Sequence, residues 1–250
     1  MYPTSTRRAA AAGASTLALA TLSACGAVGD LLPGRDPFLD QSPRSIARSS
    51  FDDMQDVSSM RILGDIDTKR FGRMRVDISV GRSGCRGSFD AGSGGGFELR
   101  QNADGTWLRA DEKFVRAHVD GQQGDQAWRM FRGKWFVADG ENEDFADLCS
   151  LDDVLADFEL EPEDTGESVS SDDVVEVGDA EAIPITGGRG RKRTTIWVSL
   201  DAPHHVLKMA PAQDAGLPDA LYFEEFGTKV VVETPSKKEI LDLPKGQAPA

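Results

Sequence analysis

Arg73-Met74-Arg75-Val76-Asp77-Ile78-Ser79-Val80 is the stretch that decides the fold. Its apolar side chains occupy every second position, with charged or polar side chains between them. Because successive side chains of a β-strand point to opposite faces, this alternation predicts a strand with one buried and one solvated face. Phe97 and Leu99 alternate with Glu98 and Arg100 in the same way. The sequence therefore predicts a sheet that packs one face against a core.

Further strands are expected on both sides of this stretch. Met60–Ile66 precedes it, and Asp104-Gly105 is a hairpin-turn signal between the strand at Phe97 and a strand at 106–108. The same pattern predicts later strands at 134–137, 173–184, 194–200, 206–209, 221–226 and 229–232.

Two segments have helical rather than strand spacing. Ser42-Pro43 offers an N-cap and a proline at the first helical position, and an apolar stripe from Ile46 to Val57 follows. Residues 143–158 carry Leu and Phe mainly at steps of three and four, which predicts one bent helix or two short ones. The expected fold class is α+β: a large curled antiparallel sheet, or half-barrel, covered on its concave face by a few helices.

The chain has 250 residues and a formal net charge of −14. The acidic excess lies in one central block, because no Lys or Arg occurs between Trp135 and Gly188. This balance argues against a nucleic acid partner, which would need clustered basic residues. The segment 139–144 does not place carboxylates at the positions of an EF-hand loop, so the acidic block is interpreted as a solvated segment rather than a calcium site.

No motif predicts catalysis. The chain has 3 cysteines and 3 histidines, without CxxC or HExxH spacing, so no metal site is expected. It lacks the GxSxG, GxxxxGK[ST] and GxGxxG patterns. The Gly92–Gly96 run is interpreted as a hairpin loop rather than a phosphate cradle, and His204-His205 as a surface turn. We expect no enzyme and no cofactor; an exported hydrolase is a remaining alternative.

The N-terminus resembles a bacterial lipoprotein signal peptide. Arg7-Arg8 precedes an uncharged apolar run, which is too short to span a bilayer. Leu22-Ser23-Ala24-Cys25-Gly26 resembles the lipobox, and the resemblance implies a diacylglycerol thioether on Cys25 after removal of residues 1–24. An ordinary signal peptidase site is the alternative, and both the general secretory and the twin-arginine route stay open. Residues 25–41 are expected to be a flexible tether, 42–244 the folded domain, and 245–250 a disordered tail.

The mature chain resembles the LolA-like and mycobacterial LprG/LppX-like lipoproteins. The stretches that carry the resemblance are 46–51, 60–66, 74–78, the Lys134-Trp135-Phe136 motif and the closing stretch 240–244. The resemblance implies a half-barrel whose concave, helix-covered face holds the acyl chains of a lipid or of a lipidated ligand. It also implies a carrier or sensor rather than a catalyst. Cys25 is the one residue whose role is carried over from the family.

The inward-facing apolar residues are the expected ligand contacts: Ile46, Met54, Met74, Val76, Ile78, Val80, Phe97, Leu99, Ile196 and Val198. Small and branched side chains favour a hollow here, although the same pattern would also suit a filled core. The expected function is lipid binding at the extracytoplasmic face of the cell membrane, with the lipid and the membrane as partners. The alternative is an envelope module that binds or scaffolds another protein and carries no lipid.

Lipidation of Cys25 would leave Cys85 and Cys149 as a pair in a compartment where disulfides persist. We expect them to form a bridge at a surface seam that ties the helical cover to the sheet. The alternative is two buried thiols that act as small hydrophobic side chains.

Overall fold

A computed structural model describes residues 36–68, 72–119, 121–138, 149–156, 169–188, 193–212 and 220–241. The chain divides into two units, Met1–Asp36 and Pro37–Ala250, and all the elements given below belong to the second. The predicted signal peptide, Cys25, residues 26–35 of the predicted tether and the predicted tail lie outside the described residues.

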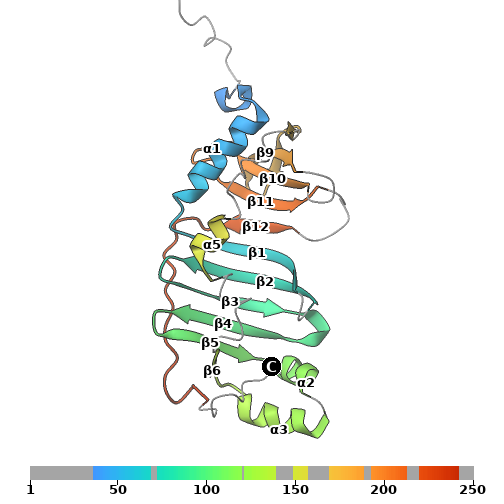
Figure 1. The fold of residues 1–250 in the computed structure, drawn as a ribbon, viewed down its shortest axis with the longest axis vertical. Coiled ribbons are helices and arrows are strands. Elements are labelled where there is room, and N and C mark those ends of the chain that lie inside the picture. The colour runs from blue at the N-terminus through green and yellow to red at the C-terminus, as the bar shows by residue number, and fades with distance from the viewer. Residues whose placement is uncertain are drawn as a thin grey trace, which may run out of the picture. The chain divides into compact units, whose positions relative to one another are not determined.

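An antiparallel sheet of 12 strands dominates the second unit (Figure 1). The strand order is β6-β5-β4-β3-β2-β1-β12-β11-β10-β9-β7, with β8 paired to β9, so the sheet is open. Among the described residues, four α-helices and two short 3-10 helices accompany it. The predicted α+β class, with a large curled antiparallel sheet and a helical cover, is confirmed.

The strands are β1 Ser59–Thr68, β2 Gly72–Gly81, β3 Gly84–Asp90, β4 Gly96–Asn102, β5 Gly105–Ala110, β6 Phe136–Val137, β7 Ser170–Ser171, β8 Val175–Val177, β9 Ala180–Gly187, β10 Thr194–Ser199, β11 Val206–Pro211 and β12 Leu221–Glu224. The helices are η1 Pro37–Asp40, α1 Pro43–Gln55, η2 Gly92–Gly94, α2 Glu112–His118, α3 Gly121–Phe131 and α5 Leu151–Ala156.

The alternating stretch Arg73–Val80 lies in β2. Val76 and Ile78 are buried on one face of the sheet, here called the inner face, and Arg75 is exposed on the opposite, outer face. Ile62 of β1 lies opposite Ile78, so the buried positions of the two strands coincide. Ile62 also lies opposite Phe223 of β12. The first and last strands of the chain therefore lie side by side in the middle of the sheet (Figure 1).

Helix α1 begins where the sequence predicts. The Ser45 backbone N–H donates to the Ser42 side chain at 3.2 Å, and Pro43 occupies the first turn, where its missing N–H is not needed. Ile46 and Met54 point into the core, as their spacing predicts. The helix crosses the end of the sheet that holds β9 to β12 (Figure 1).

The predicted tether is too long at its C-terminal end. Pro37–Asp40 forms the 3-10 helix η1, and Phe38 within it is buried. The Phe38 ring stacks on the His204 ring, with 3.6 Å between ring centroids. Residues from Pro37 onward therefore belong to the folded unit. Burial of the Phe38 ring lowers its free energy relative to exposure in water.

Helices α2 and α3 were not predicted from the sequence. Asp111 caps α2, since its Oδ1 accepts a hydrogen bond from the Phe114 N–H at 2.7 Å. Helix α2 lies against β4. Of the predicted helical segment 143–158, α5 provides the described helix, with Leu151 and Leu155 buried as expected. The remainder of that segment lies outside the described residues apart from Cys149 and Ser150.

Two predicted strand assignments are wrong. Residues 173–184 are not one strand but a hairpin of β8 and β9, which turns at Gly178 with a φ of 66°. Residues 229–232 form no strand, and neither does the described part of the closing stretch, where Ile240 makes only an isolated bridge to Trp135. Residues 227–241, here called the C-terminal strap, instead run past the ends of β1 to β6 (Figure 1).

The strap is hydrogen-bonded to the sheet along its length. The Ser59 hydroxyl donates to the Thr228 carbonyl at 2.7 Å, and Asn102 Nδ2 donates to the Val232 carbonyl at 3.1 Å. At the far end, the Trp135 N–H donates to the Glu239 carbonyl at 2.8 Å. The strap thereby joins strands from the middle of the sheet to its β6 edge.

Candidate functional site

The inner face brings together all the residues predicted to contact a ligand. They belong to one buried hydrophobic cluster, to which α1, β2, β4 and β10 contribute. The members are Ile46, Met54, Met74, Val76, Ile78, Val80, Phe97, Leu99, Ile196 and Val198. Their common location is thus as expected, and ligand contact by these residues stays a prediction.

The packing on the inner face is closed around three of its side chains. Met54, Met74 and Val80 each have 0% exposed surface. A hollow wide enough for an acyl chain would admit a water-sized sphere, and the side chains that line it would then show exposed area. Protein atoms therefore fill the space around these three side chains, and a ligand can enter there only if the helical cover moves away from the sheet.

A small set of polar contacts attaches α1 to its surroundings. The His204 backbone N–H donates to Asp53 Oδ2 at 2.7 Å, which joins α1 to the β10–β11 turn. Gln55 Nε2 donates to the Leu155 carbonyl at 3.1 Å, which joins α1 to α5. Because individual hydrogen bonds contribute about 0.5–1.5 kcal/mol, apolar burial rather than these contacts holds most of the cover in place.

The histidine turn is half-buried, not the surface turn that the sequence predicts. His205 packs against Phe226 with 4.2 Å between ring centroids. Burial is the main cause that lowers the pKa of His205 below its ordinary value of 6.5; Asp53 opposes this effect and His204 adds to it. Because the neutral imidazole is favoured, this turn packs best above the ordinary pKa of histidine.

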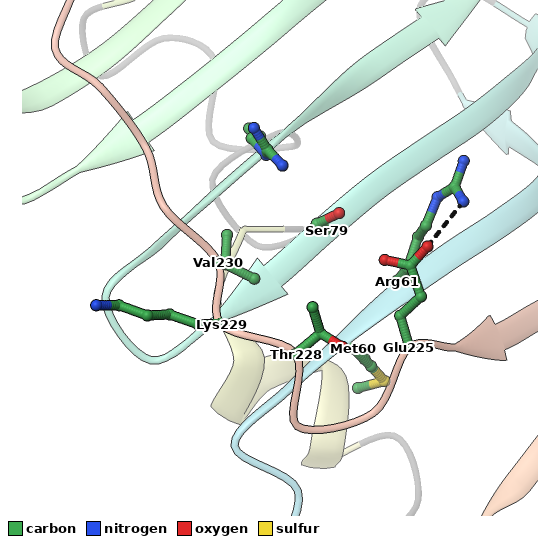
Figure 2. A pocket seen from close by; sticks show the side chains of 8 residues that line it. Met60, Arg61, Ser79, Glu225, Thr228, Lys229 and Val230 are labelled. Atoms are coloured by element: carbon green, nitrogen blue, oxygen red, sulfur yellow. Dashed lines mark hydrogen bonds and ion pairs between the residues drawn. The ribbon is translucent and has the colours of Figure 1, made fainter.

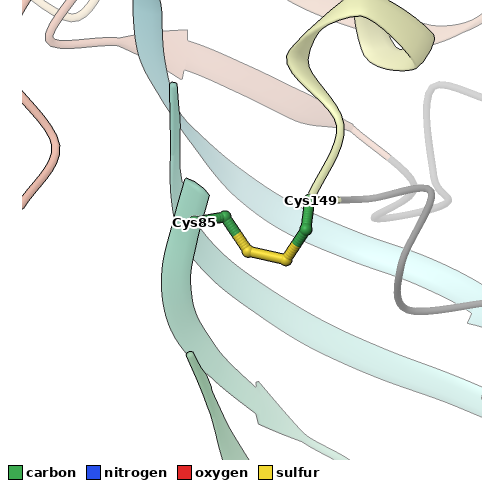
Figure 3. Close-up of a disulfide and its surroundings, with 2 residues drawn as sticks. All are labelled: Cys85 and Cys149. Atoms are coloured by element: carbon green, nitrogen blue, oxygen red, sulfur yellow. A yellow bond between two sulfur atoms is a disulfide. The ribbon is translucent and has the colours of Figure 1, made fainter. Parts of the chain in front are cut away.

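Cys85 and Cys149 form the expected disulfide (Figure 3). Its location differs from the predicted surface seam, because β3 lies between β2 and β4 and both cysteines are buried. The bridge joins the inner face of β3 to the residues just before α5. It therefore ties the helical cover to the sheet, as predicted.

A cavity of about 410 Å³ opens beside this disulfide. It lies between the start of α5 and the turns of the β2–β3 and β4–β5 hairpins, and we call it the hairpin-end cavity. Its lining residues are Gly81, Arg82, Ser83, Gly84, Gln101, Asn102, Ala103, Cys149, Ser150, Leu151 and Asp152. The cavity thus meets the inner face at the hairpin end of β2 to β5.

Gln101 was not singled out from the sequence. Its Oε1 atom is shielded from solvent and has no hydrogen-bond partner among the described residues. The period-2 pattern of Phe97 and Leu99 also places residue 101 on the inner face. A polar residue at the third inward position of that strand was the signal that could have identified it.

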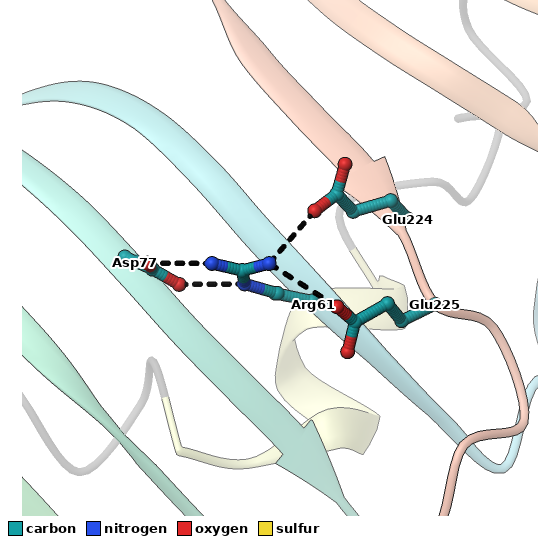
Figure 4. A network of polar contacts seen from close by, with 4 residues as sticks. All are labelled: Arg61, Asp77, Glu224 and Glu225. Atoms are coloured by element: carbon teal, nitrogen blue, oxygen red, sulfur yellow. Dashed lines mark hydrogen bonds and ion pairs between the residues drawn. The ribbon is translucent and has the colours of Figure 1, made fainter. Parts of the chain in front are cut away.

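The outer face carries a cluster of charges around Arg61 (Figure 4). Arg61 makes two 2.8 Å hydrogen bonds to Asp77 and reaches Glu224 and Glu225 at 3.1 Å. The hydrogen bond from Arg61 holds the pKa of Asp77 below its ordinary value. A neighbouring cavity of about 30 Å³, shown in Figure 2, has room for ordered water but not for an acyl chain.

The described residues include no group of three or more potential metal ligands. No helix among them combines the length and the apolar composition needed to cross a bilayer.

The sequence matches no family model and no curated protein sequence. Solved structures are similar in fold. LprF from Mycobacterium bovis is 12% identical, with a TM-score of 0.53, and the alignment covers 78% of this chain and 97% of that one. The lipoprotein LppX of Mycobacterium tuberculosis is 14% identical, with a TM-score of 0.47 and coverage of 77% and 100%. A LolA superfamily protein from Nitrosomonas europaea is 10% identical, with a TM-score of 0.22 and coverage of 82% and 96%.

The likeness to LprF shows a shared fold, and the lower TM-scores of the other two add nothing to it. The α+β fold with a large curled sheet, expected from the sequence, is therefore shared with LprF.

Proposed function

We propose that this protein is an exported lipoprotein, anchored to the membrane through Cys25, that binds an acyl-chain ligand between the inner face of its sheet and the helical cover. The supporting observation is the inner face itself, which presents one continuous apolar surface from α1 across β2, β4 and β10. Acyl chains bind to surfaces of this kind because apolar contact area, not directional bonding, provides the affinity. The fold shared with LprF agrees with this proposal.

The composition of the closed core favours adaptation to a ligand. Met54, Met60 and Met74 are all buried in the cluster on the inner face. Methionine is unbranched and has three rotatable side-chain bonds, so it can repack around a guest at lower cost than a β-branched residue. A cover that moves away from such a surface can reclose on a chain of variable shape.

The anchor would keep the folded unit near the bilayer. Eleven residues separate Cys25 from Pro37. A fully extended segment of that length reaches about 40 Å at most, since each residue adds about 3.3–3.6 Å. Two acyl chains on Cys25 would hold the protein durably, whereas a single chain gives only reversible attachment.

Lipid uptake from vesicles tests this function. Delipidated protein is incubated with phosphatidylglycerol vesicles that contain 1-monooleoylglycerol, separated from them by flotation, and extracted for mass spectrometry. The proposal expects lipid in the protein fraction, and less of it in an Ile78→Trp variant, because the indole would occupy the inner face. A wild-type fraction without lipid would contradict the proposal.

A protein-interaction module that carries no lipid is the second candidate. The observation that favours it is the closed packing around Met54, Met74 and Val80. In that case the inner face is an ordinary core, and Ile78→Trp would only overpack it, at a cost of about 1–3 kcal/mol of stability. Lipid-free protein recovered from its own membranes would support this second function.

A further inference from the structure

We propose that the hairpin-end cavity holds the polar end of the ligand, and that this end is an uncharged headgroup with a hydroxyl donor, recognised by Gln101. This inference rests on the proposed acyl-chain function. It adds the direction in which the ligand lies and the chemical class of its headgroup.

The strand register places the cavity where the apolar surface of the inner face ends. On β4, Phe97 and Leu99 are buried on this face, and Gln101 is the next residue on the same side. Its cross-strand partners are Cys85 on β3 and Thr106 on β5. The inner face therefore changes from apolar to polar within one residue pair, beside the cavity. A lipid that follows the apolar rows would bring its headgroup to this position.

The side chain of Gln101 has an unpaired hydrogen-bond acceptor at this position. Gln101 lines the cavity, and its Oε1 has no donor among the described residues. This atom is shielded from solvent in the closed structure, so a ligand reaches it only when α5 moves away from the hairpins. A carboxamide oxygen can accept two hydrogen bonds, and a buried acceptor without a donor destabilises the closed form. A hydroxyl that enters between α5 and the hairpins would provide this donor and relieve that cost. A headgroup without a donor, such as a methyl ester, would not.

The charges of the lining favour a neutral headgroup. Arg82 from the β2–β3 turn and Asp152 from α5 form an ion pair at 3.1 Å. They are the two charged side chains among the lining residues that the structure describes, and each compensates the other. An anionic or cationic headgroup would have to break this pair to gain a partner, whereas a hydroxylated neutral headgroup leaves it intact.

The same ion pair provides a way to open the cavity. Arg82 and Asp152 lie on its two walls, and both side chains are largely exposed, so the pair is weak and reversible. The Cys85–Cys149 disulfide, in contrast, holds the start of α5 to β3 permanently. The hairpin-end cavity can therefore open by a movement of α5 about the disulfide, while α5 stays attached to β3.

Calorimetric titration of purified, delipidated full-length protein with two probes tests the proposal. One probe is 1-monooleoylglycerol, which has hydroxyl donors, and the other is methyl oleate, which has none. We expect Gln101→Leu to weaken binding of 1-monooleoylglycerol by roughly tenfold, the effect of one lost hydrogen bond, and to leave methyl oleate unchanged. Gln126→Leu, the same exchange at an exposed position of α3, should change neither affinity.

Equal effects of Gln101→Leu on both probes, or no effect on either, would overturn this assignment while the proposed lipid-binding function stands. A wild-type protein that binds neither probe would overturn both. Gln101→Leu is expected to fold, because an apolar side chain of similar size replaces an unpaired polar one.

As a second variant, Arg82→Ala should speed release of 1-monooleoylglycerol by up to roughly fivefold, the range for an exposed ion pair. Unchanged release would contradict the opening movement.

Discussion

Cys85 of β3 and Cys149, two residues before α5, are joined by a disulfide that links positions 64 residues apart in the sequence, with 5.1 Å between their Cα atoms. Because Cys85 lies on the inner face and Cys149 leads directly into α5, the bond connects the two layers between which a ligand would lie. It restricts how far the cover can leave the sheet.

Removal of this disulfide should lower stability. Closing a loop of 64 residues restricts the unfolded chain, and loop-closure entropy for that length amounts to about 4 kcal/mol. We expect the Cys85→Ala/Cys149→Ala double variant to lose about that free energy of unfolding in urea titrations. Thiol titration of denatured, unreduced mature protein is the control. Two free thiols would show that the bridge does not form.

Stability at the β6 edge of the sheet should depend on the Trp135 side chain. Its side chain is 1% exposed, and the guanidinium carbons of Arg100 and Arg109 lie 4.5 Å and 4.6 Å from its ring centroid. Trp135→Ala should reduce the free energy of unfolding by about 3–5 kcal/mol, as for other buried aromatic residues, whereas Trp135→Phe should retain most of it. Equal stability of the alanine variant and the wild type would contradict the packing described for the Trp135 side chain.

Acid should lower the stability of the fold through His205. The folded-state pKa of His205 lies below 6.5, mainly because burial disfavours the charged ring. The unfolded chain therefore binds a proton first as the pH falls below that value, and stability decreases until the folded-state pKa is reached. Unfolding titrations from about pH 8 to about pH 5 should show a smaller loss in His205→Phe than in the wild type. The same loss of stability with falling pH in His205→Phe and in the wild type would exclude a contribution from His205.

Anchoring should depend on Cys25, which lies outside the described residues. Cys25→Ala should leave the precursor uncleaved or release the protein into the soluble fraction, because the thioether is the proposed durable attachment. Fractionation and immunoblotting measure this. Maturation that is insensitive to globomycin, together with unchanged fractionation of the variant, would contradict lipidation.

Much of the sheet could be predicted because its signal is local. The alternation around Val76 and Ile78 reports which face is buried, and the paired strand β1 repeats it in register. The capping pattern at Ser42-Pro43 likewise depends on a few neighbouring residues. Helices α2 and α3 were missed because their packing is tertiary: α2 lies against β4, and α3 lies against α2. Asp111 nevertheless offered a capping signal for α2.

The site was less predictable because it depends on contacts between distant segments. Residues 229–232 have strand-like composition, yet the Val232 carbonyl accepts its hydrogen bond from the side chain of Asn102, 130 positions away. Gln101 is recognisable as unpaired only once α5 and two hairpins surround it. Alternation also cannot distinguish a filled core from a ligand cavity, since both require the same apolar rows.

Native mass spectrometry of the protein purified from its own membranes tests the central claim most directly. We predict a mass that exceeds that of the lipidated polypeptide by one noncovalent lipid, released on collisional activation, and a lower occupancy in Ile78→Trp. Wild-type protein that carries no such ligand, under conditions that preserve the fold, would contradict the claim that the inner face binds an acyl chain.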